Sequence, residues 1–191
     1  MPTLAELERE ALSCTRCPLA GGRTQVVFGV GDPTTDLMFV GEGPGREEDL
    51  KGEPFVGRSG QLLDRLMWEE LGRTRDSCYI ANVVKCRPPG NRDPEPIEVA
   101  TCRPYLDAQV DAIRPRVIVT LGNFATKALL ATTEGITRLR GRVYPFSGHE
   151  GTVIVPTFHP SAALRSGGGT TLAGMRADFV RAKEALAGVA S

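Results

Sequence analysis

Four cysteines are spaced so that they could bind a metal. Cys14 and Cys17 form a CxxC pair, while Cys86 and Cys102 have fifteen residues between them and enclose a proline-rich segment. Thiolates are soft ligands for zinc and for iron–sulfur clusters, and four-cysteine zinc sites usually pair two short knuckles. The long second spacing favours an iron–sulfur cluster, with zinc as the alternative. The fifth cysteine, Cys78, is expected to pack inside a strand.

One of the two histidines is a candidate for catalysis. His149 lies in the glycine-rich turn SGHEG, where an ordinary surface position is expected. His159 directly follows an apolar run and precedes Pro-Ser. In open α/β sheets, ligands bind outside the carboxyl ends of the strands. We therefore expect His159 to face a ligand.

A glycine-rich segment, GEGPGREED at residues 41–49, follows another apolar run. It matches neither GxGxxG nor GxxxxGK[ST], so the sequence gives poor support to nucleotide binding. A Gly-Pro-Gly turn after a buried strand lets a flat ligand approach the backbone closely. The segment is therefore expected to line the same crevice as His159.

Apolar runs alternate with helical patterns along the whole chain. Strands are expected at 36–41, 78–85, 116–122 and 152–158. Helices are expected at 60–72 with Ser59 as N-cap, from Asp93 and Pro94 to 114, at 124–131 and at 175–187. This order predicts an α/β fold with three layers, α/β/α, around a mostly parallel four-stranded sheet, in a single domain spanning residues 1–191.

Composition is that of an ordinary globular protein. Hydrophobic residues make up 41% and charged residues 24%, and 23 basic residues balance 23 acidic ones, so net charge gives no argument for a nucleic-acid partner. The N-terminal stretch MPTLAELEREAL has neither a basic region nor a long apolar run, so we expect no signal peptide, no membrane partner and a cytoplasmic location. Thiols stay reduced there, which favours metal ligands over disulfides.

Five motifs in order, together with the four cysteines, resemble the family 4 uracil-DNA glycosylases. The motifs are GEGPGREED, GEPFVGRSGQLLD, ANVVKCRPPGNRDPEP, VIVTLG and TFHPSAALR. The resemblance implies a base-excision-repair hydrolase that flips uracil out of single- or double-stranded DNA and cuts its glycosidic bond, leaving an abasic site. It also implies a monomer that carries a [4Fe–4S] cluster on Cys14, Cys17, Cys86 and Cys102.

The resemblance further implies a role for three residues of the crevice. Phe55 would stack on the flipped uracil. Asn82 would read the base, because an amide can accept from N3–H and donate to O4, whereas cytosine presents the opposite pattern. His159 would be the electrophile placed against O2, where negative charge accumulates as the bond to the sugar lengthens.

The attacking water must be held without the carboxylate that family 1 enzymes provide. Gly43 stands where those enzymes carry an aspartate, as in family 4 members. The Gly43 carbonyl is expected to hold the water, with Glu42 and Glu48 as helpers. Pro44 completes a uracil-binding loop with Glu42 and Gly43.

Four further residues are expected to contact DNA by the same resemblance. Leu164 would fill the space that the flipped base leaves, and Arg165 would meet a phosphate. Ser161 belongs to the same loop, and Ser59 would contact the backbone across the groove.

Three alternative functions are weighed against this reading. The first is a branch of the superfamily that is trapped covalently on its product by a histidine after the third cysteine. No histidine lies between Cys86 and Cys102, so covalent trapping is rejected. A catalytically weak DNA-lesion-binding module of the same fold remains, although a pure binder has no need of His159. A zinc-binding nucleotide-processing protein would be colourless, whereas an iron–sulfur protein is brown.

Overall fold

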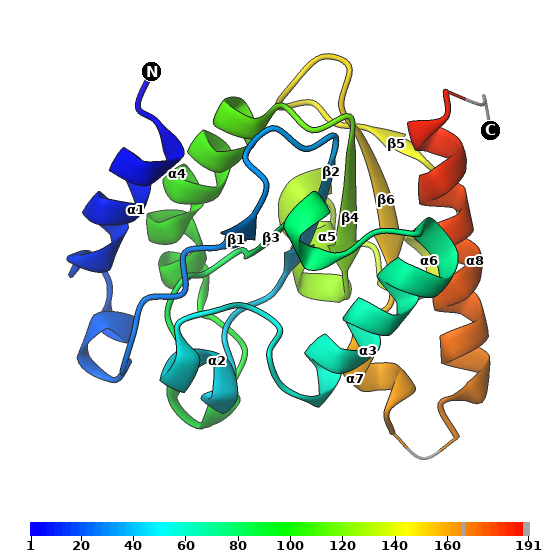
Figure 1. Cartoon of the computed structure of the whole chain (residues 1–191). Helices are drawn as coiled ribbons and strands as arrows, with labels where there is room; N and C mark the ends of the chain where they lie inside the picture. Colours follow the sequence, from blue (N-terminus) through cyan, green and yellow to red (C-terminus); the bar gives the residue numbers. More distant parts are fainter. Residues whose placement is uncertain (166, 189–191) are drawn as a thin grey trace.

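A six-stranded sheet forms the centre of the computed structural model, which describes residues 1–165 and 167–188 (Figure 1). Four strands run parallel in the order β3-β2-β4-β6. They are β2 (Leu37–Gly41), β3 (Tyr79–Asn82), β4 (Val117–Leu121) and β6 (Val153–Thr157). The predicted α/β class and the parallel four-stranded centre are confirmed.

Two short antiparallel strands extend the sheet beyond the four that were predicted. β1 (Val30–Gly31) pairs with β3 at one edge, and β5 (Tyr144–Pro145) pairs with β6 at the other. Each has only two residues, which is too short to produce a recognisable period in the sequence. The expected count of four strands was therefore too low.

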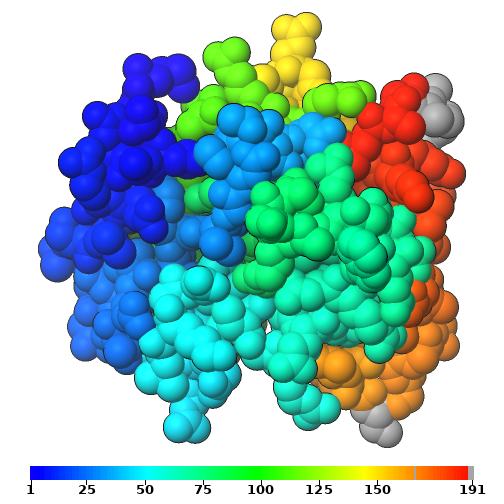
Figure 2. All heavy atoms as spheres, viewed as in Figure 1, coloured from blue at the N-terminus to red at the C-terminus, as the bar shows by residue number. Residues whose placement is uncertain are grey.

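Helices cover both faces of the sheet, which gives the predicted three layers. Alternate residues of a strand point to opposite faces, so Met38 and Val40 pack on one side while Leu37 and Phe39 pack on the other. The first side is covered by α1 (Leu4–Leu12), α4 (Pro96–Ile113) and α5 (Asn123–Leu130). The second is covered by α3 (Arg58–Leu66), its π-helical continuation η2 (Met67–Leu71) and α8 (Gly169–Leu186). Figure 2 shows α1 and α8 at opposite flanks of the molecule.

Several helix boundaries differ from the prediction. α3 has Gly57 as its N-cap instead of Ser59, and α4 has Glu95 instead of Asp93. The Glu95 side chain closes a capping box with Glu98, so α4 starts two residues later than predicted, with Pro96 as its first residue. α8 begins at Gly169, before the predicted residue 175, because its first turns bury no residue and so give no apolar signal.

Six short helical turns connect these elements. They are η1 (Pro18–Gly21), α2 (Arg46–Lys51), η3 (Arg75–Ser77), η4 (Pro89–Asn91), α6 (Ile136–Leu139) and α7 (Pro160–Ala163). The segments with α2, η4 and α7 follow the carboxyl ends of β2, β3 and β6, so they gather at one edge of the sheet (Figure 1). Over residues 1–165 and 167–188, none of the helices combines the length and apolar character needed to cross a membrane.

Candidate active site and cysteine pocket

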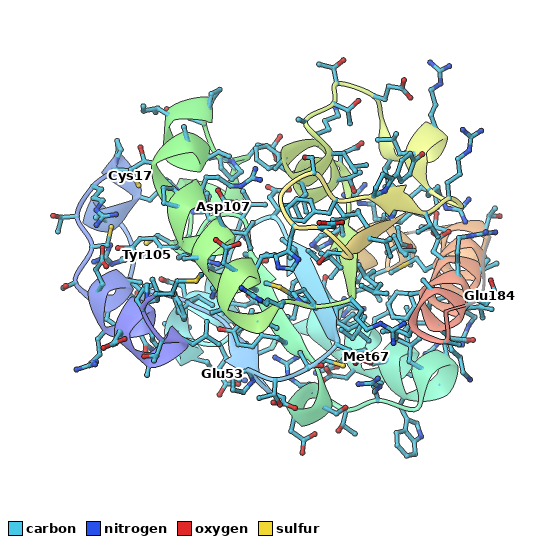
Figure 3. All side chains as sticks on the ribbon, turned by 90° about the horizontal axis from the view of Figure 1, so that it is seen from above. Cys17, Glu53, Met67, Tyr105, Asp107 and Glu184 are labelled. Carbon is cyan, nitrogen blue, oxygen red and sulfur yellow. The ribbon has the colours of Figure 1, made fainter. Side chains whose placement is uncertain are left out.

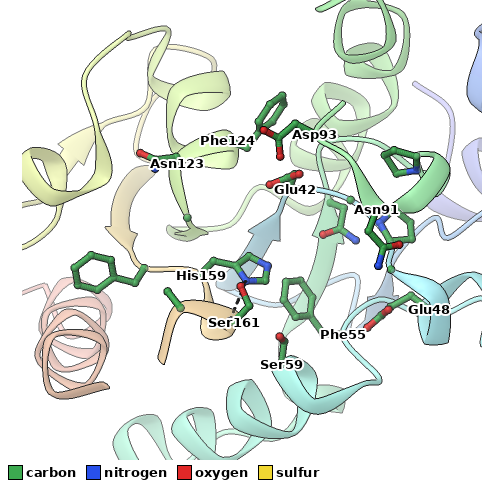
Figure 4. Close-up of a pocket in the computed structure, with 18 of the residues that line it drawn as sticks. Glu42, Glu48, Phe55, Ser59, Asn91, Asp93, Asn123, Phe124, His159 and Ser161 are labelled. Carbon is green, nitrogen blue, oxygen red and sulfur yellow. Dashed lines mark hydrogen bonds between the residues drawn. The ribbon is translucent and has the colours of Figure 1, made fainter. Parts of the chain in front are cut away.

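A cleft of about 590 Å³ opens at the carboxyl edge of the parallel strands (Figure 4). The predicted residues that line it are Glu42, Gly43, Pro44, Glu48, Phe55, Ser59, Asn82, His159, Ser161 and Arg165. Leu164 is outside this lining and lies at the end of α7, 40% exposed. The cleft therefore brings together residues that are far apart in the sequence.

The imidazole of His159 is held by the first residues of α7. Its Nδ1 accepts from the backbone N–H of Ser161 at 3.1 Å and lies 2.8 Å from the Ser161 hydroxyl (Figure 4). An Nδ1 that accepts leaves the proton of the neutral ring on Nε2. Burial, together with the charge of Arg165, lowers the pKa of His159 to about 4. At neutral pH the ring is therefore uncharged and offers Nε2–H as a donor.

The strand end that carries His159 is anchored to α8. Thr157 donates through its hydroxyl to Asp178 at 2.8 Å, and Arg140 forms a close ion pair with the same buried carboxylate at 2.9 Å. Gly122 permits the close approach of His159 to the end of β4, because a Cβ at this left-handed position would lie 2.9 Å from the His159 Cβ. His159 is thus fixed from two neighbouring strands.

Asn82 ends β3 and presents an unpartnered amide oxygen in the cleft. Its Oδ1 is buried, and none of the described residues donates a hydrogen bond to it. A buried acceptor without a donor costs about 1–3 kcal/mol, which a ligand that donates there would recover. Gly41 makes room for this arrangement, because a Cβ there would lie 2.6 Å from Asn82 Oδ1 and 2.5 Å from the Phe55 ring.

Phe55 is held in an unusual backbone conformation beside the imidazole. Its φ is +53°, in the left-handed region that side-chain-bearing residues rarely adopt, and its ring centroid lies 5.7 Å from that of His159. Glu48 Oε1 accepts from the N–H groups of Val56 and Gly57, at 3.2 and 3.3 Å, and Arg75 donates to the Phe55 carbonyl at 3.0 Å. Such strain persists only when neighbouring contacts impose it.

The carboxyl groups of Glu42 and Asp93 lie next to each other in the wall of the cleft (Figure 4). Burial raises the pKa of Glu42 to about 7, and the negative charge of Asp93 and a hydrogen bond between the two carboxyl groups add to the effect. Glu42 therefore exchanges its proton near neutral pH. The position of Glu42 is fixed by its backbone carbonyl, which accepts from the N–H of Val84 at 3.1 Å.

Several residues of the cleft were not predicted. They include Asn91, Arg92, Asp93, Asn123, Phe124, Ile136 and Phe158. Asn123 and Phe124 directly follow the end of β4, so the reasoning that selected His159 could have found them. The sequence pattern predicts Asp93 at the start of a helix, and only the folded loop shows that it meets Glu42.

The four cysteines predicted as ligands line a second, smaller cavity of about 20 Å³. Cys14 and Cys17 lie between α1 and η1, Cys86 follows β3, and Cys102 belongs to α4. Figure 3 shows Cys17 and Tyr105 of α4 at the same flank of the molecule, away from Met67 and Glu184. Cys78 lies apart from them and is fully buried in the core, as predicted, but it directly precedes β3 instead of belonging to it, because β3 covers only Tyr79–Asn82 of the expected strand 78–85.

The side chains of this cysteine pocket suit a thiolate-bound metal group that carries a net negative charge. All four thiols are free of disulfides, and Arg23 and Lys85 are among the lining residues. Arg23 lies 3.5 Å from Cys86 Sγ and donates to the Cys14 carbonyl at 2.6 Å. Among the described residues, no three His, Cys, Asp or Glu side chains are grouped as a site for a metal ion, so the fit rests on donor type and surrounding charge.

Comparison with known proteins identifies the class to which this fold and cleft belong. Residues 28–186 match the family model described as the uracil DNA glycosylase superfamily, and the chain belongs to that superfamily. Among curated proteins, it is similar to type-4 uracil-DNA glycosylases. That of Sulfurisphaera tokodaii is 48% identical over 86% of this chain and 77% of the relative. That of Saccharolobus solfataricus is 41% identical over 97% of this chain and 88% of the relative. That of Thermotoga maritima is 50% identical over 80% of this chain and 79% of the relative. The resemblance to family 4 is confirmed.

Proposed function

We propose that this chain removes uracil from DNA by hydrolysing the N-glycosidic bond, which leaves an abasic site. The observation that carries the proposal is the buried, unpartnered Oδ1 of Asn82. Uracil presents N3–H, a donor that suits this acceptor, whereas cytosine presents a bare N3 at the same place. The curated relatives named above bear this activity in their names.

Some residues of the cleft act on the departing base, and others act on the attacking water. Phe55 stacks on the flipped base, and Nε2–H of His159 donates to O2 as the bonding electrons pass to the departing uracil. One preorganised donor of this kind contributes roughly 3 kcal/mol to transition-state stabilisation. Water bonds to C1′ of the sugar, held by the Gly43 carbonyl, and Glu42 accepts its proton. Glu48 acts through the loop that positions Phe55, and Pro44 shapes the slot.

The rim of the cleft is proposed to bind DNA. Arg165 supplies a phosphate contact and the exposed Leu164 fills the space that the base vacates. Ser59 lines the cleft from the start of α3, which packs against α7, and is proposed to contact the DNA backbone. Ser161 is proposed to have two roles: it orients His159 through its backbone N–H, and it contacts DNA from the rim loop. We further propose that the protein acts as a cytoplasmic monomer.

Cys14, Cys17, Cys86 and Cys102 are proposed to bind a [4Fe–4S] cluster. When bound, such a cluster supplies a rigid cross-link between the N-terminal segment, the end of β3 and α4. Hydrolysis of the glycosidic bond transfers no electron, so the role is structural.

The function is tested by measuring uracil release from labelled oligonucleotides. Single-stranded U, U·G and U·A substrates are compared with matched strands that carry cytosine or thymine. Release restricted to uracil is expected. A purified, iron-loaded protein that leaves uracil in place in all three contexts would contradict the proposal.

Asp93→Asn is expected to extend the activity to lower pH. The pKa of Glu42, raised to about 7 by burial and by Asp93, falls when the neighbouring charge is removed. More Glu42 is then ionised at pH 6, so single-turnover uracil release is faster there. At pH 8 Glu42 is ionised in both proteins and the rates agree. Asp107→Asn, at an exposed site on α4, serves as the control, and an unchanged pH profile in Asp93→Asn would count against Glu42 as the base.

Cys86→Ser is expected to remove most of the iron and the visible absorbance. Structural metal sites supply a large share of folding free energy in small proteins, so the melting temperature falls by roughly 10 °C or more. Cys78→Ala provides a matched control, because it deletes a buried thiol outside the cysteine pocket and keeps the iron. Wild-type protein without iron, or Cys86→Ser with full iron content, would exclude the assignment.

A further inference from the structure

Lys85 is a buried lysine whose ammonium meets no carboxylate among the residues that the structure describes. The residue is 2% exposed, and its ammonium donates to the backbone carbonyl of Asn82 at 2.8 Å and to Gln109 Oε1 at 2.6 Å. Gln109 is itself buried and is fixed by donating to the Phe28 carbonyl at 2.8 Å. Within the described residues, no ion pair includes Lys85. A buried cation held only by neutral acceptors is strongly unfavourable unless a negative charge lies nearby.

The cysteine pocket is where such a negative charge fits. Lys85 lines the pocket together with Cys86 and Cys102. The residues described along that lining include Arg16 and Arg23 but no carboxylate. Four thiolates in this position would place negative charge beside the Lys85 ammonium.

The hydrogen bond from the Lys85 ammonium to the Asn82 carbonyl connects the pocket to the uracil cleft. Asn82 ends β3, so the carbonyl that Lys85 holds belongs to the residue whose side chain faces the cleft. Lys85 is the third residue after Asn82, so the contact closes a tight turn between β3 and Cys86. Lys85 therefore links the lining of the cysteine pocket to the backbone of Asn82.

We propose that Lys85 is a positioning residue that joins the cysteine pocket to Asn82, with its charge balanced by the thiolate-bound group and its ammonium fixing the strand end that reads the base. The inference rests on the proposed cluster and on the proposed reading of uracil by Asn82. It gives the cluster a second consequence besides cross-linking: its loss leaves Lys85 without a counter-charge and disturbs uracil recognition.

The test uses Lys85→Met, which keeps an unbranched apolar side chain and removes the charge. In the iron-loaded protein we expect faster loss of iron to a chelator and a melting temperature lower by about 5 °C or more. In protein stripped of iron, the counter-charge supplied by the cluster is gone and the same substitution removes an uncompensated charge, so the melting temperature rises or stays unchanged. Lys183→Met, at an exposed site on α8, shifts neither form.

Binding of free uracil to the iron-loaded protein tests the connection to the cleft. Lys85→Met is expected to weaken this binding about tenfold through the lost contact to the Asn82 carbonyl. Iron loss and uracil affinity that both match wild type would overturn the inference, and so would a melting temperature lowered equally with and without iron. If the stripped protein does not fold, the iron-loss rate and the uracil affinity decide. Wild-type protein that binds no iron, or that releases no uracil, refutes the proposals on which the inference rests and is seen before any Lys85 variant is made.

Discussion

Replacing His159 with alanine lowers the single-turnover rate of uracil release by about 10²–10³-fold, the loss expected when one preorganised donor to a developing anion is removed. The Nδ1 of this histidine accepts from Ser161, so the donor lost is Nε2–H. Because burial lowers its pKa to about 4, the ring is neutral throughout the range from pH 5 to 8. The loss in His159→Ala is therefore the same at every pH in that range.

The matched control is His149→Ala, which deletes the only other histidine of the sequence. His149 is outside the cleft lining, and this variant should release uracil at the wild-type rate. Binding of abasic product DNA by His159→Ala should be largely preserved, which separates a chemical defect from a folding defect. A loss of less than about threefold in His159→Ala would remove the electrophile role, since even a weak hydrogen bond contributes that much.

Asn82→Asp changes which base is accepted. In the slot a carboxyl group is desolvated, which raises its pKa and favours the protonated form. A protonated carboxyl can donate to N3 of cytosine while accepting from its amino group, the reverse of what Asn82 offers to uracil. The wild-type preference for uracil over cytosine, about 10⁴-fold or more for a site built around paired hydrogen bonds, is expected to fall by at least two orders of magnitude.

The measurement compares single-turnover release from strands that carry uracil and cytosine at the same position. Asn123→Asp is the control, because it places a carboxyl in the same cleft while Oδ1 can still accept from the N–H of Ile136. Asn123→Asp should retain the preference for uracil. Cytosine that remains fully refused by Asn82→Asp, alongside normal folding, would refute the hydrogen-bond account of specificity.

The sequence was sufficient to predict the sheet centre and most of the cleft, for a simple physical reason. A parallel strand covered on both faces is a continuous apolar run, and the residue that follows it lies at the edge where ligands bind. Gly41 ends β2 and His159 follows β6 at this edge. Asn82 ends β3, but the expected strand 78–85 ran past it, and the family resemblance selected this residue. The two-residue edge strands carry no comparable signal.

Contacts between distant loops could not be predicted in the same way. Asp93 meets Glu42 only because the proline-rich segment folds back over the end of β2, and no periodicity in the sequence records that path. The left-handed backbone of Phe55 depends on Arg75, which is twenty residues away along the chain. Such contacts depend on tertiary structure, so local residue patterns do not reveal them.

The amide oxygen of Asn82, which none of the described residues satisfies, favours recognition of the base but lowers the stability of the folded protein. A leucine at this position would fill a similar volume without an orphaned acceptor, so selection for heat resistance alone would tend to discard the asparagine. Retaining the asparagine means that the empty enzyme is less stable than its own framework allows. An engineering programme that improves this protein by screening for stability should therefore exclude position 82 from its library.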